Sequence, residues 1–145
     1  TAYEILTCDW SSDVCLPIYV GQAGLGQHTK MTNQIVIAGT IAGVVEAIHY
    51  AHQTNLDTDT MMKCISKGAA GSWQLEHNGQ AILDNNLQPG FYIKHFIKDM
   101  KIAQEEMSDR DIELEILNKV LEMYTNLNKD ELGTQALIHH YEKEN

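Results

Sequence analysis

The stretch from Met31 to Tyr50 constrains the fold more than any other part of the chain, because its only charged residue is Glu46. In a helix, its β-branched apolar residues would fall on every side: Ile35, Ile37, Ile41, Val44, Val45 and Ile48. A helix that is apolar all round is normally surrounded by protein. We therefore predict a central buried helix, with small residues at positions 38, 39, 42 and 43 where neighbouring backbones can approach closely. In so short a chain, such a helix also points to a further domain or a partner subunit that covers it.

The rest of the sequence from Tyr19 onward is typical of successive helices, since the chain contains only two prolines and no strand-like alternation follows. A glycine-rich loop, GQAGLGQHT, leads into the central helix. We predict helices at about residues 29–54, 59–66, 73–83, 92–107, 111–127 and 129–141, and we expect the tail HHYEKEN, residues 139–145, to fray. Asp57 or Thr58 would cap the second helix and Ser72 the third. The predicted fold class is all-α, a single domain of about six helices around a long buried central helix.

Residues 1–18 show neither helical nor strand periodicity, and they contain an unpatterned polar cluster around Trp10. The segments TAYE and CDWSSDVC resemble the conceptual translation of a DNA sequencing-library adapter. We therefore predict that residues 1–18 are a non-native leader and that the natural protein begins between Leu16 and Tyr19. The alternative is a genuine but poorly ordered N-terminal arm. In either case residues 19–145 form the helical domain.

Composition argues against several classes of partner. The net charge is −10, and an acidic chain repels phosphate backbones, so we expect no nucleic acid. The longest uncharged run, Met31 to Val45, is shorter than a membrane span, and no basic cluster would attract an anionic membrane. Three cysteines without metal-ligand spacing, and no signal-peptide pattern, favour a reduced, cytoplasmic protein. His49 and His52 share a helical face without a carboxylate at matching spacing, so we predict no metal site.

The candidate site consists of Lys30, Asn33 and Gln34, which share one face at the start of the central helix. A lysine can exchange a proton or polarise a carbonyl oxygen, and both suit the interconversion of an alcohol and a carbonyl compound. The two amides can hydrogen-bond a substrate hydroxyl or carboxylate. Glycines before the helix, including Gly24, let backbone N–H groups approach a ligand. The plainer alternative is a solvated lysine after a turn, and the order GxxGxG is not the dinucleotide fingerprint GxGxxG.

The run GQAGLGQHTKMTNQ resembles the GxxGxGxxxKxxN signature that opens the C-terminal domain of β-hydroxyacid dehydrogenases. That family includes 3-hydroxyisobutyrate dehydrogenase and tartronate semialdehyde reductase, with 6-phosphogluconate dehydrogenase as a more distant relative. Three further motifs follow in the family's order: GAAGS at residues 68–72, PGF at residues 89–91, and the KDxxxA segment that begins at Lys98. The resemblance covers about residues 19–141. It implies a helical domain like the C-terminal domain of 6-phosphogluconate dehydrogenase.

The resemblance also implies roles for individual residues. Lys30 matches the family's catalytic lysine, and Lys98 matches its lysine near the cofactor. Substrate-binding positions would be Asn33, Gln34 and Gly24, although many members have Asn in place of Gln34. Asp99 is given a structural role, paired with Lys94, with Lys98 or with a neighbouring helix.

The function implied by the family is reversible hydride transfer between NAD or NADP and a short β-hydroxyacid. An N-terminal Rossmann domain, absent from this chain, would hold most of the cofactor. We therefore expect this chain to be inactive alone. Its expected partners are the hydroxyacid, the missing domain and, in a homo-oligomer, further copies of itself. The alternative function is a non-catalytic helical dimerisation or binding module.

Overall fold

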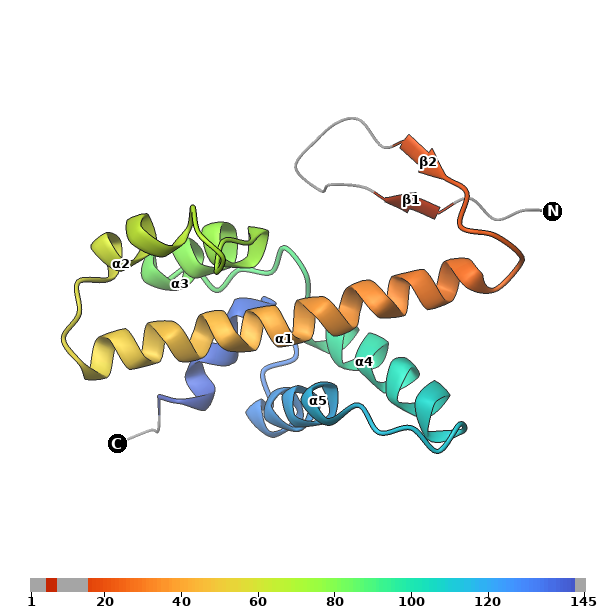
Figure 1. Ribbon diagram of the computed structural model, residues 1–145. Helices are drawn as coiled ribbons and strands as arrows, with labels where there is room; N and C mark the ends of the chain where they lie inside the picture. The colour runs from red at the N-terminus through yellow and green to blue at the C-terminus, as the bar shows by residue number, and fades with distance from the viewer. Residues whose placement is uncertain (1–4, 8–15, 143–145) are drawn as a thin grey trace. The chain divides into compact units, whose positions relative to one another are not determined.

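The computed structural model describes residues 5–7 and 16–142 (Figure 1). The chain divides into two units, residues 1–33 and 34–145, and the boundary lies inside the first helix. The described helices are α1 (Leu25–Gln53), α2 (Thr58–Ile65), the π-helix η1 (Gln74–Gly79), α3 (Gln80–Leu83), α4 (Ile93–Ser108), α5 (Glu115–Leu127) and the 3-10 helix η2 (Thr134–His140). Because η1 runs directly into α3, the described part of the chain has six helical segments, and the predicted helical fold is confirmed.

Two short strands, β1 (Ile5–Thr7) and β2 (Leu16–Ile18), pair antiparallel in the first unit, with Ile5 opposite Ile18. Sequence analysis found no strand pattern here and missed both strands. Three residues are too few to show a convincing period-2 alternation. The non-native origin of residues 1–18 stays a prediction.

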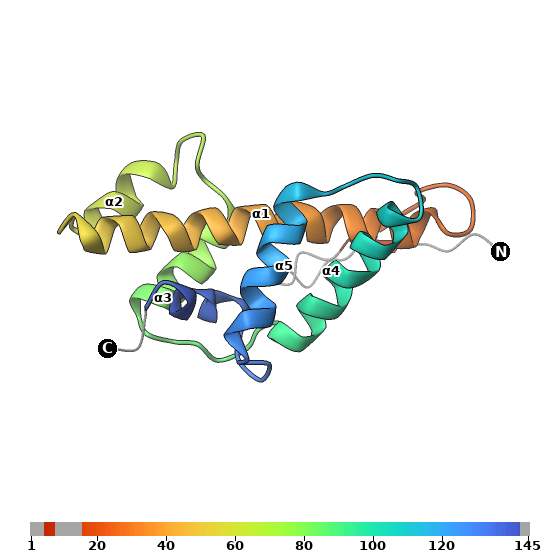
Figure 2. The same ribbon diagram turned by 90° about the horizontal axis from the view of Figure 1, so that it is seen from below.

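From Gln34 onward, α1 forms the centre of the second unit, as predicted. Its fully buried residues are Ala38, Ile41, Val45, Ile48 and Ala51. The other helices of this unit are distributed around α1 in both views (Figures 1 and 2). One glycine allows close approach. A Cβ at Gly79 would lie 3.1 Å from Met62 Cε of α2 and 3.4 Å from Val44 Cγ1 of α1.

By length and composition alone, α1 is long and apolar enough to cross a membrane, and 39% of its apolar window is buried inside the protein. Core helices of soluble proteins meet the same criterion. The five fully buried positions show that part of α1 lies in the core of the second unit. Val36 and Tyr50 are exposed on it, at 63% and 68%. If another domain or subunit packs against α1, as the sequence predicts, Val36 and Tyr50 are positions that it would bury.

The start of α2 is capped as the sequence predicts. Asp57 has an extended backbone, and its Oδ1 accepts a hydrogen bond of 2.8 Å from the Thr60 N–H. Ser72 does the same for the next helical segment, where its Oγ accepts from the Leu75 N–H at 3.1 Å. That segment begins as the π-helix η1, which the sequence pattern did not predict.

Replacing Asp57 with Ala is expected to lower the melting temperature at neutral pH, because the cap bond is lost. Hydrogen bonds from Thr60 hold the pKa of Asp57 below its ordinary value of 3.8. A lowered folded-state pKa stabilises the protein above the unfolded-state pKa, and that contribution is lost as the pH falls through the folded-state pKa. Melting of the wild-type chain and of Asp57→Ala can be followed by circular dichroism from neutral pH to below 3.8. The difference between their melting temperatures should shrink as the pH falls. Asp57→Asn keeps the oxygen acceptor and serves as the control. A difference of constant size at all pH values would contradict the role of the carboxylate.

The last two helices begin later than predicted. α5 begins at Glu115 instead of 111, because Asp111 adopts a left-handed φ of 58° and closes the turn after α4. The final helix begins at Thr134 instead of 129, and it is a 3-10 helix. Before it, Gly133 forms an isolated β-bridge with Tyr92, which requires extended backbone.

The first turn of α4 is held by backbone carbonyls from the connection between α5 and η2. The Ile93 N–H donates to the Leu132 carbonyl at 3.0 Å, and the Lys94 N–H donates to the Asp130 carbonyl at 3.2 Å. These bonds satisfy donors that a helix start otherwise leaves without partners. The position of α4 therefore depends on residues much later in the chain.

The predicted fraying of the tail is wrong as far as Tyr141. Its hydroxyl donates to Glu46 Oε1 of α1 at 2.6 Å, and its ring stacks on His49. Burial and this hydrogen bond raise the pKa of Tyr141 well above its ordinary value. The only charged side chain between Met31 and Tyr50 thus anchors the C-terminal segment.

Candidate functional site

The glycine-rich loop is shorter than predicted, because α1 begins at Leu25. Gly24 has a φ of +96°, a left-handed conformation that favours glycine. Its carbonyl accepts hydrogen bonds from the N–H groups of Gln27 (3.0 Å) and His28 (3.3 Å). Gly24 is therefore the residue at which the chain turns into α1.

Lys30 and Asn33 follow in the next turns of α1, in the first unit, and both are exposed. Their spacing of three residues places them on neighbouring positions of one helical face, as predicted. An exposed ammonium and an exposed amide on one face of a rigid helix are suited to contact a small polar ligand.

Gln34 behaves differently from its neighbour Asn33, because only 6% of it is exposed. Its Nε2 donates a hydrogen bond of 2.8 Å to Oδ2 of Asp99 on α4, which is also 6% exposed. Of the three arrangements that the sequence left open for Asp99, the structure confirms pairing with a neighbouring helix. The sequence did not indicate which residue of that helix it would be.

Lys98 precedes Asp99 on α4 and is exposed. Lys94, one turn earlier, is paired with Glu131, with 2.8 Å between Nζ and Oε1. The hydrogen bond to Glu131 raises the pKa of Lys94 above its ordinary value. Of these two exposed lysines of α4, Lys94 is therefore the one that forms an ion pair with Glu131.

Sequence analysis missed an aromatic cluster where α4 begins. The rings of Phe91 and His95 lie 6.3 Å apart, those of Tyr92 and His95 lie 5.8 Å apart, and Lys94 Nζ lies 4.9 Å from the centre of the Tyr92 ring. Both Phe91 and Tyr92 are more than one-third exposed. The PGF motif and the tyrosine that follows it were the signal available, but nothing in the sequence showed that these rings would face solvent.

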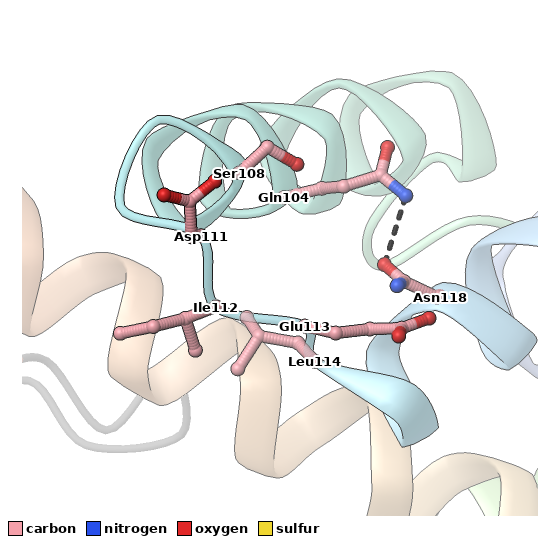
Figure 3. Close-up of a pocket in the computed structure, with 7 residues that line it drawn as sticks. All are labelled: Gln104, Ser108, Asp111, Ile112, Glu113, Leu114 and Asn118. Carbon is pink, nitrogen blue, oxygen red and sulfur yellow. Dashed lines mark hydrogen bonds between the residues drawn. The ribbon is translucent and has the colours of Figure 1, made fainter.

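A cavity of about 290 Å³ lies at the connection between α4 and α5 (Figure 3). Its lining residues are Gln104, Ser108, Asp111, Ile112, Glu113, Leu114 and Asn118. None of the predicted site residues lines it. Among the described residues, no group of three histidines, cysteines or carboxylates lies close enough to hold a metal ion.

The connection from β2 to α1 can be compared with the dinucleotide-binding arrangement, which places a glycine-rich turn between a parallel strand and a helix. Here β2 leads through Gly21 and Gly24 into α1, but β2 pairs antiparallel with β1. The described residues of the first unit therefore do not form a βαβ unit for a pyrophosphate. Lys98 is exposed, and a single ammonium group would offer a phosphate-bearing ligand one contact, not a complete site.

Residues 24–141 match the family described as "NAD-binding of NADP-dependent 3-hydroxyisobutyrate dehydrogenase". The chain belongs to this family. The match begins at Gly24, includes Lys30, Gln34 and Lys98, and ends at Tyr141. It therefore contains every residue selected from the sequence as a site residue.

Individual proteins are also similar to most of this chain. An uncharacterized oxidoreductase of Bacillus subtilis, YkwC, is 42% identical over 137 residues, which cover 86% of this chain and 48% of that protein. A probable mitochondrial 3-hydroxyisobutyrate dehydrogenase-like protein of Arabidopsis thaliana is 40% identical over 123 residues, covering 83% of this chain and 37% of that protein. This chain therefore spans half or less of the length of these relatives.

A solved structure has the same helical fold. The 3-hydroxyisobutyrate dehydrogenase of Mycobacterium tuberculosis, determined with L-serine, superposes with a TM-score of 0.80 at 22% identity. The comparison covers 86% of this chain and 46% of that chain. At this identity the similarity establishes the fold, and the sequence relatives establish the family.

Proposed function

We propose that this chain is the substrate-binding and catalytic C-terminal domain of an NAD(P)-dependent oxidoreductase. The reaction is hydride transfer between the nicotinamide cofactor and a short β-hydroxyacid, of the 3-hydroxyisobutyrate or tartronate semialdehyde type. The observation that carries the proposal is the family match over residues 24–141, which includes an exposed lysine on the opening turns of α1.

In this proposal Lys30 exchanges the proton of the substrate hydroxyl. Oxidation of an alcohol requires that its O–H proton leaves while the carbon loses a hydride, and a positioned side chain accelerates the proton transfer. A bound nicotinamide would supply the acceptor for that hydride. Asn33 donates a hydrogen bond from its side-chain amide to the substrate, and the backbone at Gly24 can approach the substrate because no side chain intervenes.

Lys98 is the residue of this chain proposed to contact the cofactor. Its exposed ammonium can pair with a phosphate group, as lysines commonly do. Because the described residues lack a βαβ unit, the proposal assigns most of the dinucleotide site to a Rossmann domain in the longer protein. The matched residues cover 48% and 37% of the two relatives, and this supports the assignment of the rest of the cofactor site to a further domain.

The test is to compare the full-length parent protein with the 145-residue chain. The parent is expected to reduce NAD or NADP with 3-hydroxyisobutyrate or another short β-hydroxyacid, followed by the absorbance of the reduced nicotinamide. The chain alone is expected to show no turnover, because it lacks most of the cofactor site. Parent protein that is folded but inactive with every short hydroxyacid would contradict the proposed reaction. Turnover by the isolated chain would contradict the assignment of the cofactor site to another domain.

A non-catalytic dimerisation module is the second candidate, and exposed apolar side chains favour it. Val36 of α1 and Ile116 of α5 are 63% and 70% exposed. This function predicts a stable dimer that dissociates when both residues are replaced with Ser, and it predicts that Lys30 can be replaced without consequence. Sedimentation of the chain and of the double variant would distinguish it from the enzymatic function.

A further inference from the structure

The side chain of Gln135 holds the connection between α3 and α4, residues 84–92, within the second unit. Gln135 is only 4% exposed, and its Nε2 donates two hydrogen bonds, to the Asn86 carbonyl at 3.1 Å and to the Gln88 carbonyl at 2.9 Å. The turn between these carbonyls is itself closed, because Asn86 Oδ1 accepts from the Gln88 N–H at 3.2 Å. One buried amide group therefore fixes both ends of an exposed turn.

Backbone contacts continue this attachment as far as the start of α4. The Gly133 N–H donates to the Leu87 carbonyl at 3.0 Å. The Thr134 N–H donates to the Phe91 carbonyl at 3.2 Å, and the next residue, Tyr92, forms its β-bridge with Gly133. The α3–α4 connection is therefore joined to the start of η2 at successive points, and Phe91 is held at one of them.

Phe91 begins a line of exposed side chains that follows α4 to Lys98. The Phe91 ring is 37% exposed, and its centre lies 6.3 Å from that of the exposed His95 ring. Lys98 follows His95 by three residues, which places the two side chains on neighbouring positions of one helical face. This face therefore presents an aromatic ring and an ammonium group to the same side of α4. A dinucleotide, which has planar rings and phosphate groups, matches that combination.

We infer that Gln135 is a positioning residue for cofactor binding: by holding the α3–α4 connection, it places the Phe91 ring against the cofactor that Lys98 binds. This inference rests on the proposed function, which assigns a cofactor contact to Lys98. Phe91 supplies a flat apolar surface for a planar ring of the dinucleotide. Gln135 acts through Phe91 and does not touch the ligand itself.

Removing the amide of Gln135 is expected to loosen the connection without unfolding the domain. Asn86 and Gln88 are exposed, so water can replace Gln135 as the donor to their carbonyls. Gln135→Met keeps the side-chain volume and removes both hydrogen bonds. In the full-length enzyme this variant is expected to raise the cofactor KM about 10-fold and to retain kcat, because apparent affinity falls with the fraction of molecules in the binding-competent conformation.

Gly133 offers an independent way to displace the same amide. Its backbone is extended, with φ −71° and ψ 157°, so alanine fits there without backbone strain. A Cβ at this position would overlap the amide of Gln135, with Cδ and Nε2 each only 2.8 Å away. Gly133→Ala is therefore expected to raise the cofactor KM as Gln135→Met does. On a Gln135→Ala background no amide is left to displace, so Gly133→Ala should have no further effect.

The matched control is Gln104→Met. Gln104 Nε2 donates to Asn118 Oδ1 at 2.8 Å, so this amide also joins two elements of the second unit, but it lies outside the α3–α4 connection. The control is expected to leave the cofactor KM unchanged. An equal rise in both Gln→Met variants would overturn the positioning role, because it would show a general effect of instability. An unchanged cofactor KM in Gln135→Met would overturn it as well, and so would a full effect of Gly133→Ala on the Gln135→Ala background.

The part played by Phe91 has its own test. Phe91→Ala should raise the cofactor KM by a similar factor, whereas Phe91→Tyr, which retains a ring, should leave it nearly normal. Because Gln135 acts through this ring, Gln135→Met should add little on a Phe91→Ala background. Two independent, additive effects would show that Gln135 does not act through Phe91, and would overturn the inference.

Hydrogen exchange of the 145-residue chain tests the attachment without activity. Exchange of the backbone amides in residues 84–92 should accelerate in Gln135→Met and stay as in the wild type in Gln104→Met. Inactive wild-type enzyme would contradict the proposed function. Unchanged exchange in Gln135→Met would instead contradict the attachment on which the inference depends.

Discussion

Replacing Lys30 with Met in the full-length enzyme is expected to lower kcat by about 10²–10⁴-fold, the usual contribution of a general acid or base. Methionine retains much of the length and apolar surface of the lysine side chain but cannot exchange a proton. The Kd for the dinucleotide should change little, because Lys30 is proposed to act on the substrate hydroxyl. Steady-state kinetics would give kcat, and quenching of protein fluorescence by the cofactor would give the Kd.

The control for this prediction is Lys63→Met. Lys63 is an exposed lysine of α2 that is not part of the candidate site, so the same substitution should leave kcat unchanged. Near-normal turnover by Lys30→Met would contradict the catalytic role and favour the dimerisation module. Equal losses of activity and cofactor affinity would instead indicate that Lys30 binds the dinucleotide.

Replacing Phe96 with Ala is expected to destabilise the 145-residue chain by about 3–5 kcal/mol, the usual cost of removing a buried phenylalanine side chain. Phe96 is fully buried on α4. Its ring packs in a T-shaped arrangement against the ring of Tyr124 of α5, with 5.4 Å between the two ring centres. Tyr124 is itself held by a hydrogen bond of 2.7 Å to the Thr134 carbonyl. The cavity left by Phe96 would therefore open between elements that cannot easily close it. Urea unfolding followed by circular dichroism measures the loss.

Phe91→Ala is the matched control for Phe96→Ala. Phe91 lies 6.0 Å from the Phe96 ring but is 37% exposed, so its loss removes less buried surface. We expect a destabilisation of about 1 kcal/mol, near the average for single substitutions. Equal losses for the two variants would contradict the view that the α4–α5 contact is centred on Phe96. Asp99 lies one turn after Phe96 on α4, so this core also supports the hydrogen bond between Gln34 and Asp99.

The sequence predicted those parts of the fold that depend on local pattern. The uncharged stretch after Met31 has no polar face at any rotation, so a central helix followed directly from it. The cap of α2 was equally predictable, because Asp57 stands where an extended residue precedes a helical run. That Lys30 and Asn33 share a helical face was also predictable, because their spacing of three residues decides it. Their roles in a site stay a prediction.

The parts that were missed depend on contacts between distant residues. Nothing in the sequence showed that Gln34 would turn inward while Asn33 stays exposed, since both are amides at the start of the same helix. Their difference arises from a carboxylate 65 residues later. The late start of η2 has the same kind of cause, because Gly133 is drawn into extended pairing with Tyr92. Local propensity cannot anticipate a partner that only the folded chain provides.

The backbone bonds at the start of α4 have a consequence for how the protein is made. The N–H groups of Ile93 and Lys94 receive their acceptors from Leu132 and Asp130, after all of α5 has been added to the chain. On the ribosome, which releases the polypeptide from its N-terminal end, the first turn of α4 must wait for those carbonyls. The helix that bears Lys98 and Asp99 is therefore completed late in synthesis, and a chain that terminates before Asp130 would lack its native beginning.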